Sequence, residues 1–324
     1  MTMFDKIVVI TKKTPLEELI ERFNTLSQAK FYIEHSGQPF AEYEAYHGAY
    51  HKSLARLRQA LPSEMKTQFV ERGFLTNFLF GDKDLVITLG PDGLVVNTAK
   101  YLDGQFIMAV NPDSSRIDGI LVPFLIDNIS ARLETVLSGE FRHEDISMAK
   151  VKLDNGQTLY AVNDFFVGPK SHTCLRYTIK HGGRAEEQMS SGLIISTGAG
   201  STGWFRAVVA GAEGVYKGFT GGAARAGSGE RTNPGRASLN TRFDRSSEEL
   251  VFMVREPFES KTSKAGIVFG KVTPASPLTI VSHTPSGGVI FSDGIESDFL
   301  EFNSGRTAVI TIAEKKVKLI RLTV

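Results

Sequence analysis

The stretch that most constrains the fold is residues 84–102, which combine a buried strand, a tight turn and a helix. Residues 85–89 form a short apolar run rich in β-branched side chains, typical of a strand that is buried on both faces. The turn Gly90-Pro91-Asp92-Gly93 interrupts this run, and residues 94–102 have apolar positions at helical spacing. This order places backbone N–H groups and the positive end of a helix where an anion can bind.

Asp92 is a carboxylate within this turn, and it would repel a phosphate unless a cation or a proton donor intervened. The combination therefore indicates phosphoryl transfer, in which Asp92 orients an attacking hydroxyl, holds Mg²⁺, or does both. Gly, Pro and Asp are also common turn residues, so a turn without a function is the alternative.

Length and composition describe a globular protein of about two domains, with 324 residues, 41% hydrophobic and 23% charged. The net charge of +1 gives no overall attraction to nucleic acid or to a membrane, and we expect neither as a partner. A single cysteine, Cys174, excludes an intrachain disulfide. Because residues 7–10 are too few for a secretory signal and long apolar runs are lacking, we expect a cytoplasmic protein.

The first third of the chain alternates strand and helix patterns. The expected strands are residues 7–10, 31–33, 85–89 and 105–110, and the expected helices are residues 14–28, 41–61, 94–102 and 127–137. Thr14-Pro15-Leu16-Glu17 has the pattern of a capping box at the start of the first helix. This alternation predicts a doubly wound α/β domain with a mostly parallel sheet, whose ligands bind at the carboxyl ends of strands, where Asp92 and Asn111 lie.

His47 and His51 are four residues apart in the second expected helix and can share a face, as metal ligands do. No third ligand lies nearby in the sequence. We therefore predict that the two histidines are surface or partly packed residues and that they form no metal site.

Beyond Gly139 the pattern changes to short β-type runs. Asp154-Asn155-Gly156 separates two of them and is a strong hairpin signal, and two further runs are expected at residues 308–313 and 316–322. We therefore divide the chain into an α/β domain at residues 1–135 and a β-rich nucleotide-binding domain at residues 136–324.

Two polar clusters interrupt the apolar pattern of the second domain. Asn163-Asp164 follows a strand and could hold the two hydroxyls of a ribose, with an Asx turn as the alternative. Residues 196–203 are small and hydroxylated, and they join a buried strand to an apolar helix. Such a loop lets a ligand approach the backbone closely. This second cluster contains Ser196, Thr197, Gly198, Ala199, Gly200, Ser201, Thr202 and Gly203.

Two other segments are candidates for function. Residues 211–247 are rich in Gly and Arg and read as a loop that could close over an anionic substrate, with a solvated loop as the simpler interpretation. Its arginines are Arg225, Arg231, Arg236, Arg242 and Arg245. Asp293-Gly294 places another carboxylate at a strand end, where it could be only a turn.

Taken together, these motifs resemble the NAD kinase family, within the superfamily that includes diacylglycerol and sphingosine kinases. Gly90-Pro91-Asp92-Gly93 matches the family's Gly-Gly-Asp-Gly, and Asn163-Asp164 matches its Asn-Glu. Ser191-Gly192 followed by residues 196–204 is similar to Asp-Gly followed by Ser-Thr-Pro-Thr-Gly-Ser-Thr-Ala-Tyr. Asp293-Gly294 is similar to a C-terminal Asp-Gly.

The resemblance implies an α/β domain and a β-rich domain, with NAD and ATP, or polyphosphate, meeting in a cleft. Asp92 would activate the 2′-hydroxyl of the NAD adenosine ribose, with Mg²⁺ neutralising phosphate charge. Nucleotide contacts would come from a wider set, and the family usually forms homodimers or homotetramers. The implied set is Gly90, Gly93, Asn111, Asn163, Asp164, Ser191, Thr197, Gly198, Gly200, Ser201, Thr202, Gly203 and Asp293.

Several positions depart from the family pattern. Pro91 replaces a glycine and lacks an N–H, Leu94 stands in place of Thr, and Ser191 in place of an acid. Asp164 is shorter than Glu, and Gly203-Trp204 replaces Ala-Tyr. Two alternatives therefore stay open: a nucleotide-binding or regulatory homologue without catalysis, and a kinase of the same fold that acts on a lipid or sugar hydroxyl.

Overall fold

The structure, a computed structural model, describes residues 3–220 and 239–321. The chain divides into two compact units: residues up to 145 together with those from 316 onward, and residues 146–315. Strands β6 (Arg142–Leu153) and β17 (Thr307–Arg321) each have residues in both units. The boundary predicted after residue 135 lies inside helix α5 (Ile129–Leu137).

The first unit is a parallel sheet with helices. Its strands are β1 (Lys6–Thr11), β2 (Lys66–Glu71), β3 (Asp84–Leu89), β4 (Phe106–Asn111), β5 (Phe124–Leu125) and the end of β17. Its other helices are α1 (Pro15–Phe23), α2 (Leu26–His35), α3 (Phe40–Ala60) and α4 (Asp92–Ala99), with 3-10 turns at Arg72–Asn77 and Ile126–Asn128. β1 pairs with β2 and β3, β3 pairs with β4, and β4 pairs with β5 and β17, all in parallel.

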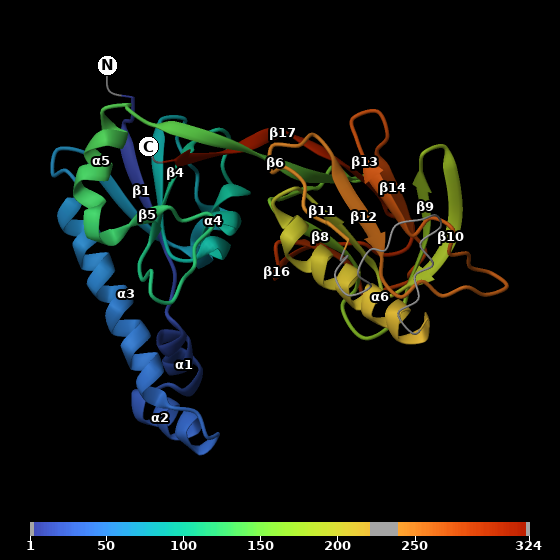
Figure 1. Cartoon of the computed structure of the whole chain (residues 1–324), viewed down its shortest axis with the longest axis horizontal. Coiled ribbons are helices and arrows are strands. Elements are labelled where there is room, and N and C mark those ends of the chain that lie inside the picture. Colours follow the sequence, from blue (N-terminus) through green and yellow to red (C-terminus); the bar gives the residue numbers. More distant parts are fainter. Residues whose placement is uncertain (1–2, 221–238, 322–324) are drawn as a thin grey trace, which may run out of the picture. The chain divides into compact units, whose positions relative to one another are not determined.

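Helices cover both faces of this sheet, with α3 and α5 on one face and α4 on the other (Figure 1). Alternate residues of the strands point to the same face, and those facing α3 and α5 form one buried core. This core includes Ile7, Val9, Leu85, Ile87, Leu89, Met108 and Val110 with Tyr50, Leu57, Ile129, Leu133 and Val136. The predicted α/β class with a mostly parallel sheet is therefore confirmed.

The N-terminal helices differ from the sequence prediction. The capping box is confirmed, because Thr14 and Glu17 exchange side-chain-to-backbone hydrogen bonds. However, α1 ends at Asn24, which has a left-handed φ of 64°, so the predicted helix at residues 14–28 is two helices. The strand predicted at residues 31–33 is wrong. These residues lie in α2, where the buried Ala29 and Ile33 are four apart, as a helix face requires.

The second unit is built from two antiparallel sheets. One contains β8 (Asp164–Pro169), β11 (Leu193–Ser196), β12 (Leu250–Val254), β13 (Phe269–Val272), β15 (Gly288–Ser292) and β16 (Ile295–Glu301), in the order β13-β12-β11-β8-β15-β16. The other contains β9 (Leu175–His181), β10 (Arg184–Ser190), β14 (Leu278–Ser282) and β17, and β6 of that sheet pairs with β7 (Thr158–Ala161). A helix, α6 (Trp204–Thr220), follows a 3-10 turn at Gly200–Thr202.

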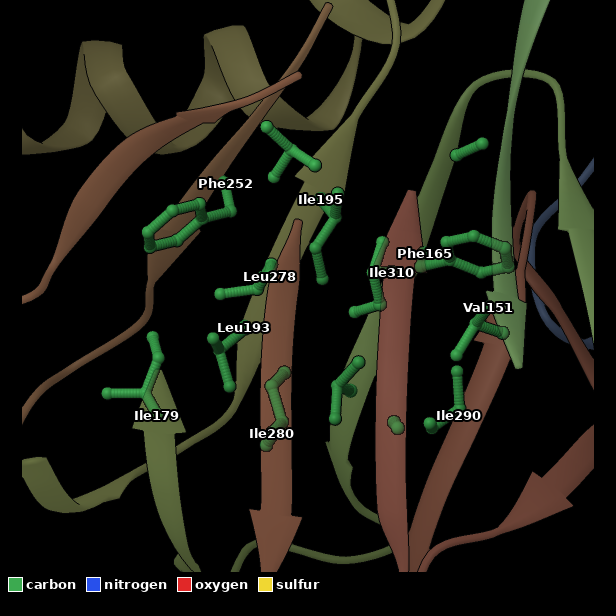
Figure 2. Packing of buried hydrophobic residues seen from close by; sticks show 14 of the residues in the cluster. Val151, Phe165, Ile179, Leu193, Ile195, Phe252, Leu278, Ile280, Ile290 and Ile310 are labelled. Atoms are coloured by element: carbon green, nitrogen blue, oxygen red, sulfur yellow. The ribbon is translucent and has the colours of Figure 1, made fainter. Parts of the chain in front are cut away.

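Side chains of the two sheets pack against one another to form the core of this unit, as Figure 2 shows. Phe165, Leu193, Ile195, Phe252 and Ile290 come from one sheet, and Val151, Ile179, Leu278, Ile280 and Ile310 from the other. All ten side chains are fully buried. The predicted β-rich second domain is confirmed.

Three local predictions for this unit have mixed outcomes. The hairpin is confirmed, because β6 pairs with β7 and Gly156 has the positive φ of 89° that its turn requires. The two strands predicted within residues 308–322 are one continuous strand, β17. Of the predicted loop at residues 211–247, residues 211–220 lie in α6, whereas Arg225, Arg231 and Arg236 lie outside the described residues.

Across residues 3–220 and 239–321, no helix is both long enough and apolar enough to cross a membrane.

Replacing Phe252 by Ala should lower the free energy of unfolding by about 3–5 kcal/mol, because this side chain fills space between the two sheets. Urea unfolding followed by the fluorescence of Trp204, the single tryptophan, measures this loss in the second unit. Phe258→Ala is the matched control, and with Phe258 55% exposed the expected change is under about 0.5 kcal/mol. Equal losses in the two variants would contradict the packing described.

Candidate functional site

Asp92 is the first residue of α4, and Gly90 and Pro91 separate it from the end of β3. Its Oδ1 accepts a hydrogen bond from the backbone N–H of Leu121 at 2.9 Å, and its Oδ2 accepts one from Ile120 at 3.1 Å. The half-buried carboxylate is thus held in one orientation. Two oxygens together offer about four lone-pair sites, so the carboxylate can still accept a proton donor from a ligand.

The glycines on either side of this residue have different roles. Gly90 is buried and donates its N–H to the carbonyl of Val110 at 3.1 Å. A Cβ at Gly90 would lie 2.8 Å from Cδ2 of Leu94, so glycine allows α4 to start close to β3. Gly93 is exposed in the first turn of α4, where N–H groups lack intrahelical partners and can face an anion.

Asn111 lies at the end of β4 and holds the loop that reaches Asp92. Its Nδ2 donates to the carbonyl of Ile117 at 2.9 Å, and its Oδ1 accepts from the N–H of Asp113 at 3.0 Å. The loop then continues to Ile120 and Leu121, whose N–H groups bind Asp92. Asn111 is 3% exposed, and its side chain therefore supports the loop conformation.

Asp293 performs a similar task in the second unit. Its Oδ1 accepts from the N–H groups of Asn163 at 2.7 Å and Asp164 at 3.3 Å, and its Oδ2 accepts from that of Val162 at 3.1 Å. Its own N–H donates to the carbonyl of Asp164 at 3.0 Å. The carboxylate thus fixes the start of β8, where Asn163 and Asp164 stand.

The loop after β11 is joined to the same point. Thr197 donates its N–H to the carbonyl of Asn163 at 2.9 Å and its hydroxyl to that of Val162 at 2.5 Å. A Cβ at Gly200 would lie 2.2 Å from the carbonyl oxygen of Asn163, so the two backbones meet only because residue 200 is glycine. The structure thus brings Asn163, Asp164, Asp293 and this loop together.

The other residues of this loop divide into buried and exposed ones. A Cβ at Gly198 would lie 1.9 Å from the carbonyl oxygen of Asp244. Ser201 is fully buried and donates its hydroxyl to the carbonyl of Gly198 at 2.7 Å. Thr202 and Gly203 are exposed, so they are the members of the loop that a ligand can reach directly.

The side chain of Asp164 has a raised pKa in this cluster. Burial and, to a smaller extent, the nearby carboxylate of Asp293 together raise the pKa of Asp164 to about 7. The side chain is 8% exposed. Close to neutral pH it can therefore carry a proton and act as a hydrogen-bond donor as well as an acceptor.

Ser191 is not brought to this cluster. β11 is antiparallel to β8, with Ser196 opposite Asp164 and Leu193 opposite Val167, so Ser191 lies beyond the other end of β11. There it lines a cavity of about 1010 Å³ together with Phe166, Trp204 and Arg255.

The same cavity has an aromatic wall. The rings of Phe166 and Trp204 stack with centroids 5.6 Å apart, and the guanidinium of Arg255 lies 5.7 Å from the Trp204 ring. Stacked rings beside a cation suit a planar, anionic ligand.

The backbone partners of Asp92 are not evident from the sequence. Ile120 and Leu121 lie 28 and 29 residues further along the chain, and only the turn signal Asp118-Gly119 marks a bend there. Gly119 has a φ of 62°, and this bend directs the two N–H groups to the carboxylate.

The two histidines of α3 do have a third possible ligand. Glu17 of α1 places Oε1 3.1 Å from Nε2 of His51, and ligand atoms of Glu17, His47 and His51 all lie within 4.8 Å of one another. This third group is distant in the sequence and reaches the histidines because α1 folds back against α3 from 30 residues earlier in the chain.

No model of a known protein family matches the chain. It is 26% identical over 250 residues to a probable NADH kinase of Oryza sativa subsp. japonica, covering 68% of this chain and 66% of that protein. It is 32% identical over 125 residues to the NAD kinase of Methylococcus capsulatus, covering 37% of this chain and 43% of that protein. The chain thus spans about two thirds of the plant relative and under half of the bacterial one.

Solved structures share the fold at low sequence identity. Yeast NADH kinase in complex with NADH matches with a TM-score of 0.54 and 14% identity, covering 98% of this chain and 84% of that one. An NAD kinase from Archaeoglobus fulgidus in complex with ATP matches with the same TM-score and identity, covering 98% and 93%.

The raised pKa of Asp164 predicts a pH-dependent stability. Because the folded state binds this proton more tightly than the unfolded state does, stability is highest below the unfolded pKa, near 4, and falls as the pH rises to about 7. Where the dependence is steepest, the free energy of unfolding should fall by about 1.4 kcal/mol per pH unit. Urea unfolding between pH 4 and 8 measures the slope.

Asp164→Asn should remove this contribution, and the exposed hairpin variant Asp154→Asn should leave it in place. Identical slopes for the wild type and Asp164→Asn would show that Asp164 is not the group responsible.

Proposed function

We propose that this chain, a divergent member of the NAD kinase family, transfers a phosphoryl group from ATP or polyphosphate to the 2′-hydroxyl of the NAD adenosine ribose. The observation that carries this proposal is the position of Asp92, fixed by two backbone N–H groups where a buried parallel strand meets a helix N-terminus.

Asp92 would accept the proton of the attacking hydroxyl and orient its oxygen toward the phosphorus. Phosphoryl transfer needs mainly positioning and charge stabilisation from the protein, and a carboxylate already held by two N–H groups loses little freedom on binding. The N–H groups of Asp92 and Gly93 at the start of α4 would stabilise phosphate charge. Mg²⁺, bound through the nucleotide phosphates, would neutralise the remaining charge.

Asn163 and Asp164 would bind a nucleoside of NAD. A ribose presents two neighbouring hydroxyls, each of which donates and accepts, and the Asn163 amide and a protonated Asp164 each offer a donor and an acceptor. Asp293 would act by positioning, because its carboxylate holds the backbone of both residues.

The loop at residues 196–203 would bind phosphate or adenine portions. Thr197, Gly198, Gly200 and Ser201 hold its backbone in place, which leaves Thr202 and Gly203 for the ligand. Asn111 would act on Asp92 through the loop it supports, and Ser191 would contact ligand groups that enter its cavity.

We also propose that the enzyme works in the cytoplasm and that it forms a homodimer or homotetramer, the assembly that the family resemblance implies. The relatives are NAD(H) kinases, and no observation favours a non-catalytic homologue or a lipid or sugar acceptor. Light scattering coupled to size-exclusion chromatography tests the assembly.

Asp92→Asn should lower kcat by roughly 10²–10⁴-fold, the usual contribution of a positioned general base. The assay is NADP formation from NAD and Mg²⁺ with ATP or polyphosphate as the donor. NAD affinity, measured by calorimetry on the same protein, should change far less than kcat, because the variant removes a proton acceptor and leaves the nucleoside contacts.

Asp103→Asn, an exposed aspartate of the same unit, is the matched control and should keep full activity. No turnover by folded wild-type protein with either donor would overturn the proposal, and so would unchanged kcat in Asp92→Asn.

A further inference from the structure

We infer that Glu17, His47 and His51 form a site for a divalent transition-metal ion, with zinc as the best fit, that joins α1 to α3. This site is separate from the residues proposed above for phosphoryl transfer. It lies wholly in the first unit.

The three donor atoms converge from two helices. His47 and His51 are four residues apart on α3, so their rings lie on one face, with centroids 4.2 Å apart. Glu17, in the first turn of α1, places Oε1 3.1 Å from Nε2 of His51. Two ligands at roughly 2.0–2.2 Å from one tetrahedral ion are about 3.3–3.6 Å apart. The observed pair is therefore already close to the separation that a bound ion requires.

Neighbouring groups hold two of these ligands in position. The hydroxyl of Thr14 lies 2.9 Å from Nδ1 of His47, and the backbone N–H of Thr14 donates to Oε2 of Glu17 at 2.7 Å. Metal-binding imidazoles and carboxylates in proteins generally have such outer partners, which fix the orientation of each ligand.

The donor set selects the kind of ion. Two imidazole nitrogens and one carboxylate oxygen suit zinc and neighbouring transition metals, whereas Mg²⁺ and Ca²⁺ prefer oxygen ligands alone. His51 is exposed and Glu17 and His47 are half-buried, so solvent can reach the ion and complete its coordination with water.

A bound ion would stiffen a segment that contacts the strand ends. Tyr50 lies between the two histidines on α3, and its hydroxyl accepts from the N–H of Lys12 at 3.1 Å and donates to the carbonyl of Leu89 at 3.4 Å. Leu89 directly precedes the turn that carries Asp92. Metal binding would thus fix α3 where it supports the ends of β1 and β3.

The test is metal binding by the full chain in the absence of nucleotide. Chelator-treated protein is titrated with Zn²⁺ by calorimetry, and Co²⁺ serves as a spectroscopic probe, because tetrahedral Co²⁺ with nitrogen and oxygen ligands absorbs visible light strongly. All proteins carry Cys174→Ser, which removes the exposed thiol two residues from His172 as a competing site. We expect one Zn²⁺ per chain, the visible Co²⁺ bands and a higher melting temperature with Zn²⁺.

Two substitutions remove single ligands while keeping the fold. Glu17→Gln retains the capping box, which accepts either residue, and His51→Gln alters an exposed side chain. Each should weaken Zn²⁺ binding at least tenfold and abolish the zinc-induced rise in melting temperature. His35→Gln, an exposed histidine on α2, is the matched control and should bind as the parent does.

Zinc affinity that is equal in the parent, Glu17→Gln and His51→Gln would overturn the inference and leave Glu17 and His51 as an ordinary hydrogen-bonded pair. Absence of Zn²⁺ binding by the parent would overturn it as well. Neither outcome depends on kinase activity.

Discussion

In each unit, one aspartate accepts backbone N–H groups from a distant segment, and the local structure of the candidate site depends on this interaction. A buried N–H without an acceptor costs about 1–3 kcal/mol, so a loop that leaves a sheet needs a partner for its N–H groups. Asp92 provides it for the buried Leu121 and also accepts from the exposed Ile120. Asp293 provides it for residues 162–164. The charge of each carboxylate makes these hydrogen bonds stronger than those of a neutral acceptor.

Three of the departures from the NAD kinase pattern, Pro91, Leu94 and Ser191, leave these interactions in place. Leu94 is 2% exposed and packs over Gly90, so the change from a hydroxylated residue points into the protein. Pro91 has a φ of −74°, which the proline ring favours, and it precedes α4 where no intrahelical N–H bond is needed. Ser191 lies just before the N-terminal end of β11, whereas Asp164 is paired with the C-terminal end of this strand. The aspartates and their backbone partners are therefore intact despite these substitutions.

The sequence was sufficient to predict the features that depend on local pattern. The buried strands β1, β3 and β4 are continuous apolar runs, and Asp154-Asn155-Gly156 specifies its hairpin through turn conformation alone. The strand prediction at residues 31–33 is wrong because it rests only on β-favouring side chains. A helix cap precedes them at Thr25, whose hydroxyl accepts a hydrogen bond from the N–H of Gln28. The helix is further stabilised because Ala29 and Ile33 pack in one buried cluster with Leu16 and Phe40.

Contacts between distant segments could not be predicted in the same way. Asp293 reads as a turn residue in the sequence, and nothing local indicates that its oxygens bind N–H groups about 130 residues earlier. Glu17 reads as a helix cap, and that role uses only one of its oxygens. Its second oxygen reaches His51 because α1 packs on α3. Apolar spacing in the sequence indicates that these helices pack against other elements, but it does not give the orientation of one helix against the other.

The two carboxyl groups near the start of β8 have separate tasks because their surroundings differ. Asp293 receives three backbone N–H groups, which favour its ionised form. Asp164, buried beside this negative charge, instead has its pKa raised to about 7. One carboxylate thus stabilises the backbone while the other retains a proton that it can offer to a ligand oxygen.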